Sequence, residues 1–217
     1  MLIPAIETSG REGSVALCRG DATSFDVLGL KDIEGGTYSA RLMPSIADLL
    51  RDAKLAKKQV DGIVVVNGPG SFTGLRVGIS TAKGLSEVLG KPLAAVSMLE
   101  ALAVVYGRPG EEVTTVLDAG RGELYAAEYR MTDCGAELLR QSVVKLTEFL
   151  AQLPSISGAV ITTWPKIPGA RLVQALRADA IARMGLQHLL AGDIADPAAL
   201  DANYIRRSDA ELYSLPK

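Results

Sequence analysis

Short apolar runs separated by glycine-containing turns open this chain. Three of them, at 2–7, 14–19 and 22–30, have the length and composition of β-strands joined by tight turns. Residues 39–53 then place apolar side chains three and four positions apart, which predicts an amphipathic helix. The other elements expected in this half are a strand at 62–67, a helix at 72–89, a strand at 92–96 and a helix that begins at Ser97.

The same order of elements is expected again after Arg108-Pro109-Gly110. Three strands of an antiparallel meander are predicted first, and a helix, a strand and a helix follow. These elements are expected at 112–118, 123–130 and 137–144, near Thr147, at 158–162 and from about 170 to 191.

Each half therefore follows the order β-β-β-α-β-α. In each half the first strand also ends in an acidic residue beside a turn with glycine, Glu7 in one and Asp118 in the other. Internal duplication of this kind is the arrangement of the actin-like, ribonuclease H-like α/β fold. We expect an N-terminal lobe at 1–108 and a smaller C-terminal lobe at 109–217 that ends in a polar tail.

Composition narrows the class of protein. The chain has 217 residues, 48% of them hydrophobic, and a net charge of −2, which suits a globular protein and argues against a stand-alone nucleic-acid binder with a basic face. Cys18 and Cys134 lie in separate segments without metal-type spacing, so we expect reduced thiols, with Cys18 in the core. We expect no signal peptide and no membrane span, and hence a cytoplasmic protein.

The most informative stretch runs from Asn67 to Ile79, with the sequence NGPGSFTGLRVGI. Glycines around Pro69 predict a tight turn between the strand and the helix. Gly74 and Gly78 then lie inside the helix, where each costs about 1 kcal/mol relative to alanine, so the helix is expected to contact something closely. The stretch lacks the Gly-Lys pair of a P-loop and fits the dinucleotide fingerprint only in part. The pattern favours a turn that positions a contact helix over a phosphate-binding loop.

The segment 68–78 is also very close to the hallmark of the TsaB (YeaZ) family. Residues 6–9 resemble the Asp-Thr-Ser strand end with which that family opens, although Glu7 replaces the aspartate. Residues 38–44 resemble its His-Ser-x-x-Leu-Leu-Pro helix, and residues 118–125 resemble its Asp-Ala-Arg-x-x-Glu-Val-Tyr segment. The resemblance covers residues 1 to about 130 well and the rest loosely.

This resemblance implies an actin-like fold and a role in making threonylcarbamoyladenosine at position 37 of tRNA. TsaB proteins of bacteria are non-catalytic subunits that pair with the catalytic subunit TsaD, or with themselves, through two helices. The ATPase TsaE is a further partner. The resemblance therefore implies a protein that has no active site of its own and reaches tRNA only within a complex.

The predicted partner interface lies on the helices at 39–53 and 72–89. Small residues on the second helix would let another helix approach closely. Close packing between these two helices of the same chain explains the small residues equally well, so the sequence leaves both interpretations open. The interface residues expected from the pattern and the resemblance are Tyr38, Arg41, Leu42, Ser45, Ile46, Leu49, Gly74, Gly78, Thr81 and Leu85.

Glu7 and Asp118 are the candidates for paired carboxylates. In an active actin-like ATPase or small-molecule kinase, such acids hold phosphate-bound Mg²⁺ or position water. The alternative is that each carboxylate accepts hydrogen bonds from its own turn. The pattern favours this alternative, because the extra methylene of Glu7 suits a magnesium site poorly.

Peptidase chemistry has little support. His188 is the only histidine, and Tyr38 stands where the family helix carries a histidine, so a two-histidine metal site cannot form. Ser71 lies out of register with a nucleophile elbow and is expected to cap the helix that follows it. We therefore expect no catalytic residue, no cofactor and no metal.

Overall fold

The computed structural model describes residues 1–133 and 135–203. Within these, the chain forms two compact units, which are described separately. The first consists of Met1–Ala101 together with Leu176–Ala202, and the second of the described part of Leu102–Ala175.

The first unit is built on a five-stranded sheet with the order β3-β2-β1-β4-β5. The central strand β1 is buried along its whole length, as its apolar run requires. It pairs antiparallel with β2 and parallel with β4. The strands are β1 (Leu2–Glu7), β2 (Glu12–Gly20), β3 (Phe25–Glu34), β4 (Ile63–Gly68) and β5 (Leu93–Ser97).

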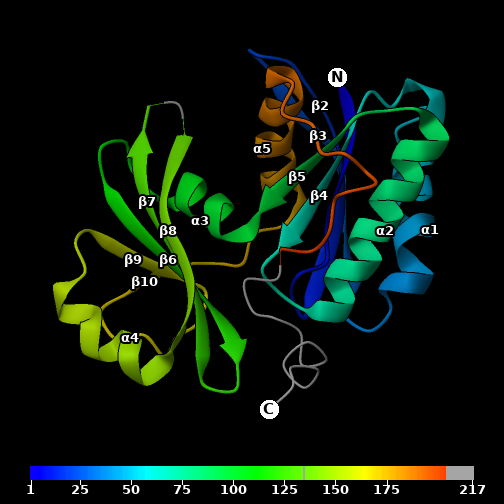
Figure 1. Cartoon of the computed structure of the whole chain (residues 1–217). Coiled ribbons are helices and arrows are strands. Elements are labelled where there is room, and N and C mark those ends of the chain that lie inside the picture. The colour runs from blue at the N-terminus through cyan, green and yellow to red at the C-terminus, as the bar shows by residue number, and fades with distance from the viewer. Residues whose placement is uncertain (134, 204–217) are drawn as a thin grey trace. The chain divides into compact units, whose positions relative to one another are not determined.

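Three long helices cover the two faces of this sheet. Helices α1 (Tyr38–Asp52) and α2 (Phe72–Leu89) lie side by side on one face, and α5 (Ala178–Ala191) lies on the other (Figure 1). Helix α5 comes very close to β4 at Gly185, where an added Cβ would lie 2.2 Å from a methyl group of Val64. A short 3-10 turn, η1 (Lys57–Gln59), precedes β4, and α3 (Met98–Tyr106) follows β5.

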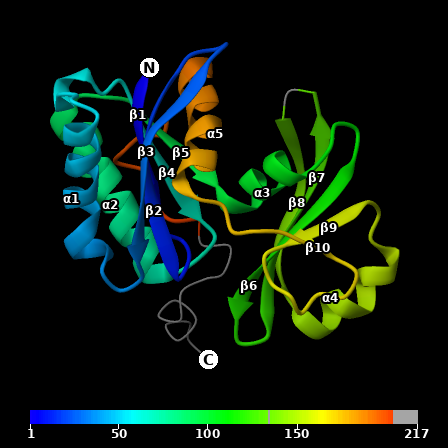
Figure 2. The same ribbon diagram turned by 180° about the vertical axis from the view of Figure 1, so that it is seen from behind.

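The second unit repeats this topology. Its sheet has the order β10-β9-β6-β7-β8 (Figure 2), with antiparallel β6–β7 and β7–β8 pairs and parallel β6–β9 and β9–β10 pairs. One face is covered by α4 (Leu146–Gln152) and the 3-10 turn η2 (Leu153–Ser155), around a core that includes Phe149. The strands are β6 (Glu112–Gly120), β7 (Glu123–Thr132), β8 (Gly135–Lys145), β9 (Ala159–Thr162) and β10 (Arg171–Leu172).

The helix expected from about 170 to 191 begins later, at Ala178. Residues 171–172 are strand β10 instead, because the Arg171 guanidinium donates to the Tyr106 carbonyl at 2.7 Å and to Glu111 at 3.0 Å, which holds this segment extended along β9.

Helix α5 packs on β1, β2, β4 and β5, so it belongs to the first unit. The expected division into 1–108 and 109–217 thus differs from the observed one, in which the chain returns to its first sheet. The polar tail expected from Asp193 begins as an ordered segment. The Ala195 amide donates to the Leu93 carbonyl at 2.8 Å, and Lys83 Nζ donates to the Leu200 carbonyl at 2.7 Å. The rest of the tail and Cys134 lie outside the described residues, whereas Cys18 is buried as predicted.

Candidate functional site

The loop between β4 and α2 is tied to the end of β1. The Ser71 amide donates to the Ser9 carbonyl at 2.7 Å, and an added Cβ at Gly70 would lie 2.5 Å from that same oxygen. Ser71 also caps α2 as predicted, because its hydroxyl accepts from the Gly74 amide at 3.3 Å. The glycine-rich turn therefore fixes where α2 begins.

Gly74 and Gly78 form the closest part of this contact. An added Cβ at Gly74 would lie 2.0 Å from the Thr8 carbonyl, and one at Gly78 would lie 2.3 Å from Thr8 Oγ1. The Thr8 hydroxyl donates to the Gly74 carbonyl at 2.8 Å, so helix and strand meet backbone to backbone. Both glycines are buried. The closest contacts of both glycines are therefore intramolecular and are made with Thr8, whereas the intramolecular alternative in the sequence analysis placed them against the helix at 39–53.

Helix α1 is also held by residues that were expected at the interface. Tyr38, Leu42, Ile46 and Leu49 are all buried, with 1% to 6% of their surface exposed. Because α1 packs on β2 and β3, this apolar stripe covers the protein's own sheet. The Tyr38 hydroxyl donates to the Gly10 carbonyl at 3.1 Å, and burial raises its pKa to about 12. These four side chains hold α1 against the sheet.

The other expected interface residues reach the surface to different extents. Arg41 is exposed, and Ser45, Thr81 and Leu85 are half-buried. The Thr81 hydroxyl donates to the Val77 carbonyl at 2.8 Å within the helix.

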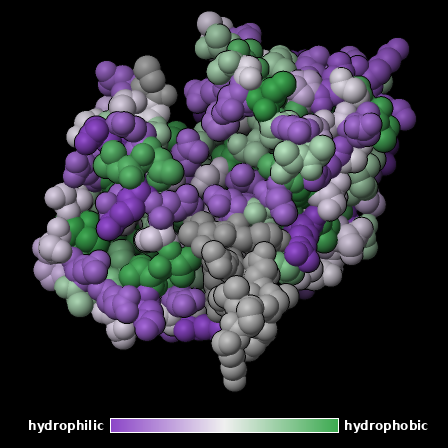
Figure 3. Space-filling view, viewed as in Figure 1, coloured by the Kyte–Doolittle hydropathy of each residue, from purple (hydrophilic) through white to green (hydrophobic). Residues whose placement is uncertain are grey.

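The surface that α1 and α2 present to solvent consists largely of residues that the sequence analysis did not select. Met43 and Val88 are large apolar residues with 47% and 79% of their surface exposed, and an added Cβ at Gly84 would meet no atom within 4 Å. Figure 3 shows one face of the molecule, on which hydrophobic and hydrophilic residues are intermixed. The sequence could have indicated these residues, because the helical period predicts which positions lie on the face opposite the buried stripe. Below, the outer surface of α1 and α2 means the exposed residues Arg41, Met43, Ala47, Ser80, Gly84 and Val88.

Glu7 and Asp118 each bind the turn that follows them. Glu7 has 3% of its surface exposed, and its Oε1 accepts from the Ser9 amide and the Ser9 hydroxyl, both at 2.6 Å. Asp118 is exposed, and its Oδ1 accepts from the Gly120 amide at 2.8 Å. The two acids belong to different units. Each carboxylate has the local hydrogen bonds that the alternative interpretation predicts.

The buried carboxyl group of Glu7 predicts a pH dependence of stability. Burial raises the pKa of Glu7 above its ordinary value of 4.5, against the opposing effect of hydrogen bonds from Ser9 and Gly10. The folded state therefore holds the proton more tightly than the unfolded state. This contribution to stability is fully present below pH 4.5 and is lost as the pH rises through the raised value.

Glu7→Gln keeps the shape of the side chain and cannot ionise. We expect the variant to show a smaller fall in unfolding midpoint than the parent between about pH 5 and pH 8 in urea titrations. Equal falls in the two proteins would assign the pH dependence to other groups.

His188 lies in a small charged cluster. Its Nδ1 is 3.5 Å from the Asp193 carboxylate. Nearby, burial raises the pKa of Glu100. Across residues 1–133 and 135–203, no group of three or more histidine, cysteine and acidic side chains could hold a metal ion. In the same residues, no helix is both long and apolar enough to cross a bilayer.

Two units with the same strand order and the same pattern of parallel and antiparallel pairs define a duplicated, actin-like and ribonuclease H-like α/β protein. A model of the family described as TsaD, tRNA N6-adenosine threonylcarbamoyltransferase, matches residues 35–181, more than half of the chain. The chain belongs to this family, and its relatives place it with the TsaB (YeaZ) proteins.

Among these relatives is the tRNA threonylcarbamoyladenosine biosynthesis protein TsaB of Bacillus subtilis. It is 37% identical over 131 residues, which are 60% of this chain and 56% of the relative. TsaB of Escherichia coli is 34% identical over 137 residues, which are 62% of this chain and 58% of the relative. The chain thus spans somewhat more than half the length of these curated relatives.

A solved structure extends the similarity over nearly the whole fold. The structure of YeaZ from Pseudomonas aeruginosa has a TM-score of 0.75 and 25% identity, and the match covers 94% of this chain and 99% of that one. The predicted family and fold class are confirmed.

Proposed function

We propose that this chain is a subunit of the machinery that makes threonylcarbamoyladenosine at position 37 of tRNA. Membership of the family and the role of its TsaB relatives in tRNA threonylcarbamoyladenosine biosynthesis support this proposal. We further propose that the chain acts by binding the catalytic subunit TsaD, together with the ATPase TsaE, in the cytoplasm. It reaches tRNA only through that complex.

The observation that carries the proposal is the way α1 and α2 pack on one side and expose apolar residues on the other. Their inner sides pack on the protein itself, through the glycine contact of α2 at Thr8 and the buried apolar stripe of α1. Their outer surface combines exposed apolar side chains, Met43 and Val88, with the open space beside Gly84. A partner helix can lie close to such a surface and bury its apolar groups. A homodimer would use the same surface.

We propose that the chain has no catalytic centre of its own. The side chains considered for chemistry have structural partners: Glu7 binds its own turn, and Ser71 caps α2. The purified chain should therefore transfer no threonylcarbamoyl group alone, and transfer to tRNA should appear when TsaD and TsaE are added.

A reconstituted assay with each component omitted in turn measures this. A robust turnover of nucleotide by the chain alone, removed by Glu7→Ala or Asp118→Ala, would instead support an actin-like ATPase or small-molecule kinase. Full transfer by TsaD and TsaE without this chain would remove the proposed role.

A further inference from the structure

One face of the second sheet changes from apolar to polar along its strands. Val116 on β6 lies opposite Ala126 on β7, and both belong to the core beneath Phe149 of α4. Two residues along each strand, a second row crosses the sheet and consists of Thr114, Glu128 and Arg140. Side chains two apart on a strand share a face, so this polar row continues the floor of the core.

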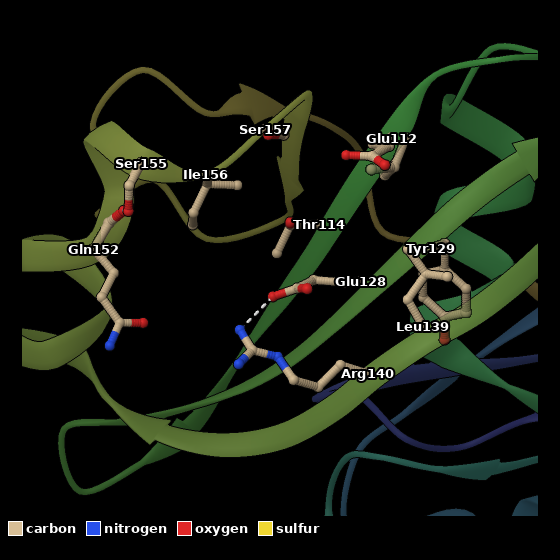
Figure 4. Close-up of a pocket in the computed structure, with 11 residues that line it drawn as sticks. Glu112, Thr114, Glu128, Tyr129, Leu139, Arg140, Gln152, Ser155, Ile156 and Ser157 are labelled. Carbon is tan, nitrogen blue, oxygen red and sulfur yellow. Dashed lines mark hydrogen bonds and ion pairs between the residues drawn. The ribbon is translucent and has the colours of Figure 1, made fainter.

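The helix that covers the apolar row ends before it covers the polar one. Helix α4 stops at Gln152, and η2 with the residues after it forms a wall beside the polar row. The cavity between floor and wall has a volume of about 300 Å³ (Figure 4). This is at the lower end of the range of about 300–1,000 Å³ for ligand pockets, so a small ligand fits. The lining residues used below are Glu112, Thr114, Glu128, Arg140, Gln152 and Ser155.

The cavity presents charges of both signs. Arg140 donates to Glu128 Oε1 at 2.5 Å, which leaves further guanidinium N–H groups and the second Glu128 oxygen for a ligand. Glu112 adds another carboxylate at the edge and makes no ion pair within the described part of the chain. Thr114, with only 3% of its surface exposed, lies on the floor of the cavity.

We propose that this cavity binds a small free α-amino acid. The ammonium group binds between the carboxylates of Glu112 and Glu128, and the ligand carboxylate accepts from Arg140. The Thr114 hydroxyl, on the floor of the cavity, provides a further polar contact to the ligand. A simple anion would face two glutamates, and a simple cation would face the arginine. A zwitterion matches the charges of both signs.

L-serine is a suitable probe, followed by two-dimensional NMR of the whole chain labelled with ¹⁵N. We expect saturable shifts at residues 112–114, 128, 140 and 152–157. Ethanolamine, which is serine without its carboxylate, and glycerate, which has a hydroxyl in place of the ammonium, should each bind at least about tenfold more weakly, since each loses one charge-assisted pair. Equal binding of serine and either analogue, or no shifts at tens of millimolar serine, would overturn the proposal.

Arg140→Gln should weaken serine binding by about tenfold or more. Arg130→Gln is the matched control, because Arg130 and Arg140 make similar exposed ion pairs, with Glu137 and Glu128, and their side chains are 53% and 67% exposed. Arg130 does not line the cavity. Equal losses in the two variants would show that serine responds to general surface charge and would contradict the site.

Discussion

Gly78→Leu is expected to lower the melting temperature of this protein by about 6–12 °C, which corresponds to about 3 kcal/mol of overpacking in a chain of this size. An added Cβ at this position would lie 2.3 Å from Thr8 Oγ1 and 3.5 Å from a methyl group of Ile6. Ile6 of β1 and Thr8, which follows the strand, are both fully buried, so neither can move aside without disturbing the packing around the sheet. Thermal unfolding followed by circular dichroism measures the change.

The control for this variant is Gly84→Leu, on the same helix but beside open space. It should melt at or slightly above the temperature of the parent, because replacing a helical glycine gains up to about 1 kcal/mol. If Gly78→Leu melts like Gly84→Leu, the close contact between α2 and β1 does not hold the fold together.

Gly84→Leu is also expected to weaken binding to TsaD by about 5- to 150-fold, because the new side chain would project into the space of a partner helix at a cost of about 1–3 kcal/mol. Isothermal titration of the purified chain into TsaD measures the affinity. The same variant separates folding from binding, since its own fold has room for the leucine. Unchanged affinity would remove the outer surface of α2 from the proposed interface.

Much of the first unit could be predicted because its sequence signals are local. Helix α2 begins and ends where the sequence indicated, between the Ser71 cap and Gly90, which has a φ of 61°. Strand β1 was predicted correctly from its unbroken apolar run. The family resemblance also depends on short segments that lie in turns and helix starts, where particular residue types are required.

Two features depend on contacts between distant residues, and local patterns do not contain them. Helix α5 returns to the first sheet, which the sequence order of the second half conceals. For a related reason, the sequence analysis assigned residues that pack on the protein's own sheet to the partner interface. An apolar stripe such as Leu42 and Ile46 looks the same whether it covers its own sheet or a partner, and only the tertiary structure decides. Gly74 and Gly78 were correctly expected to permit close contact, but the atoms that they contact most closely belong to Thr8 of the same chain.

The central claim is that this chain supports the threonylcarbamoyl modification of tRNA by association. The most direct measurement is nucleoside mass spectrometry of bulk tRNA after depletion of the protein in its own host cell. We predict that threonylcarbamoyladenosine falls upon depletion and returns when the parent chain or Glu7→Gln is supplied, but returns only in part with Gly84→Leu. An unchanged level of threonylcarbamoyladenosine in the depleted cells would contradict the account.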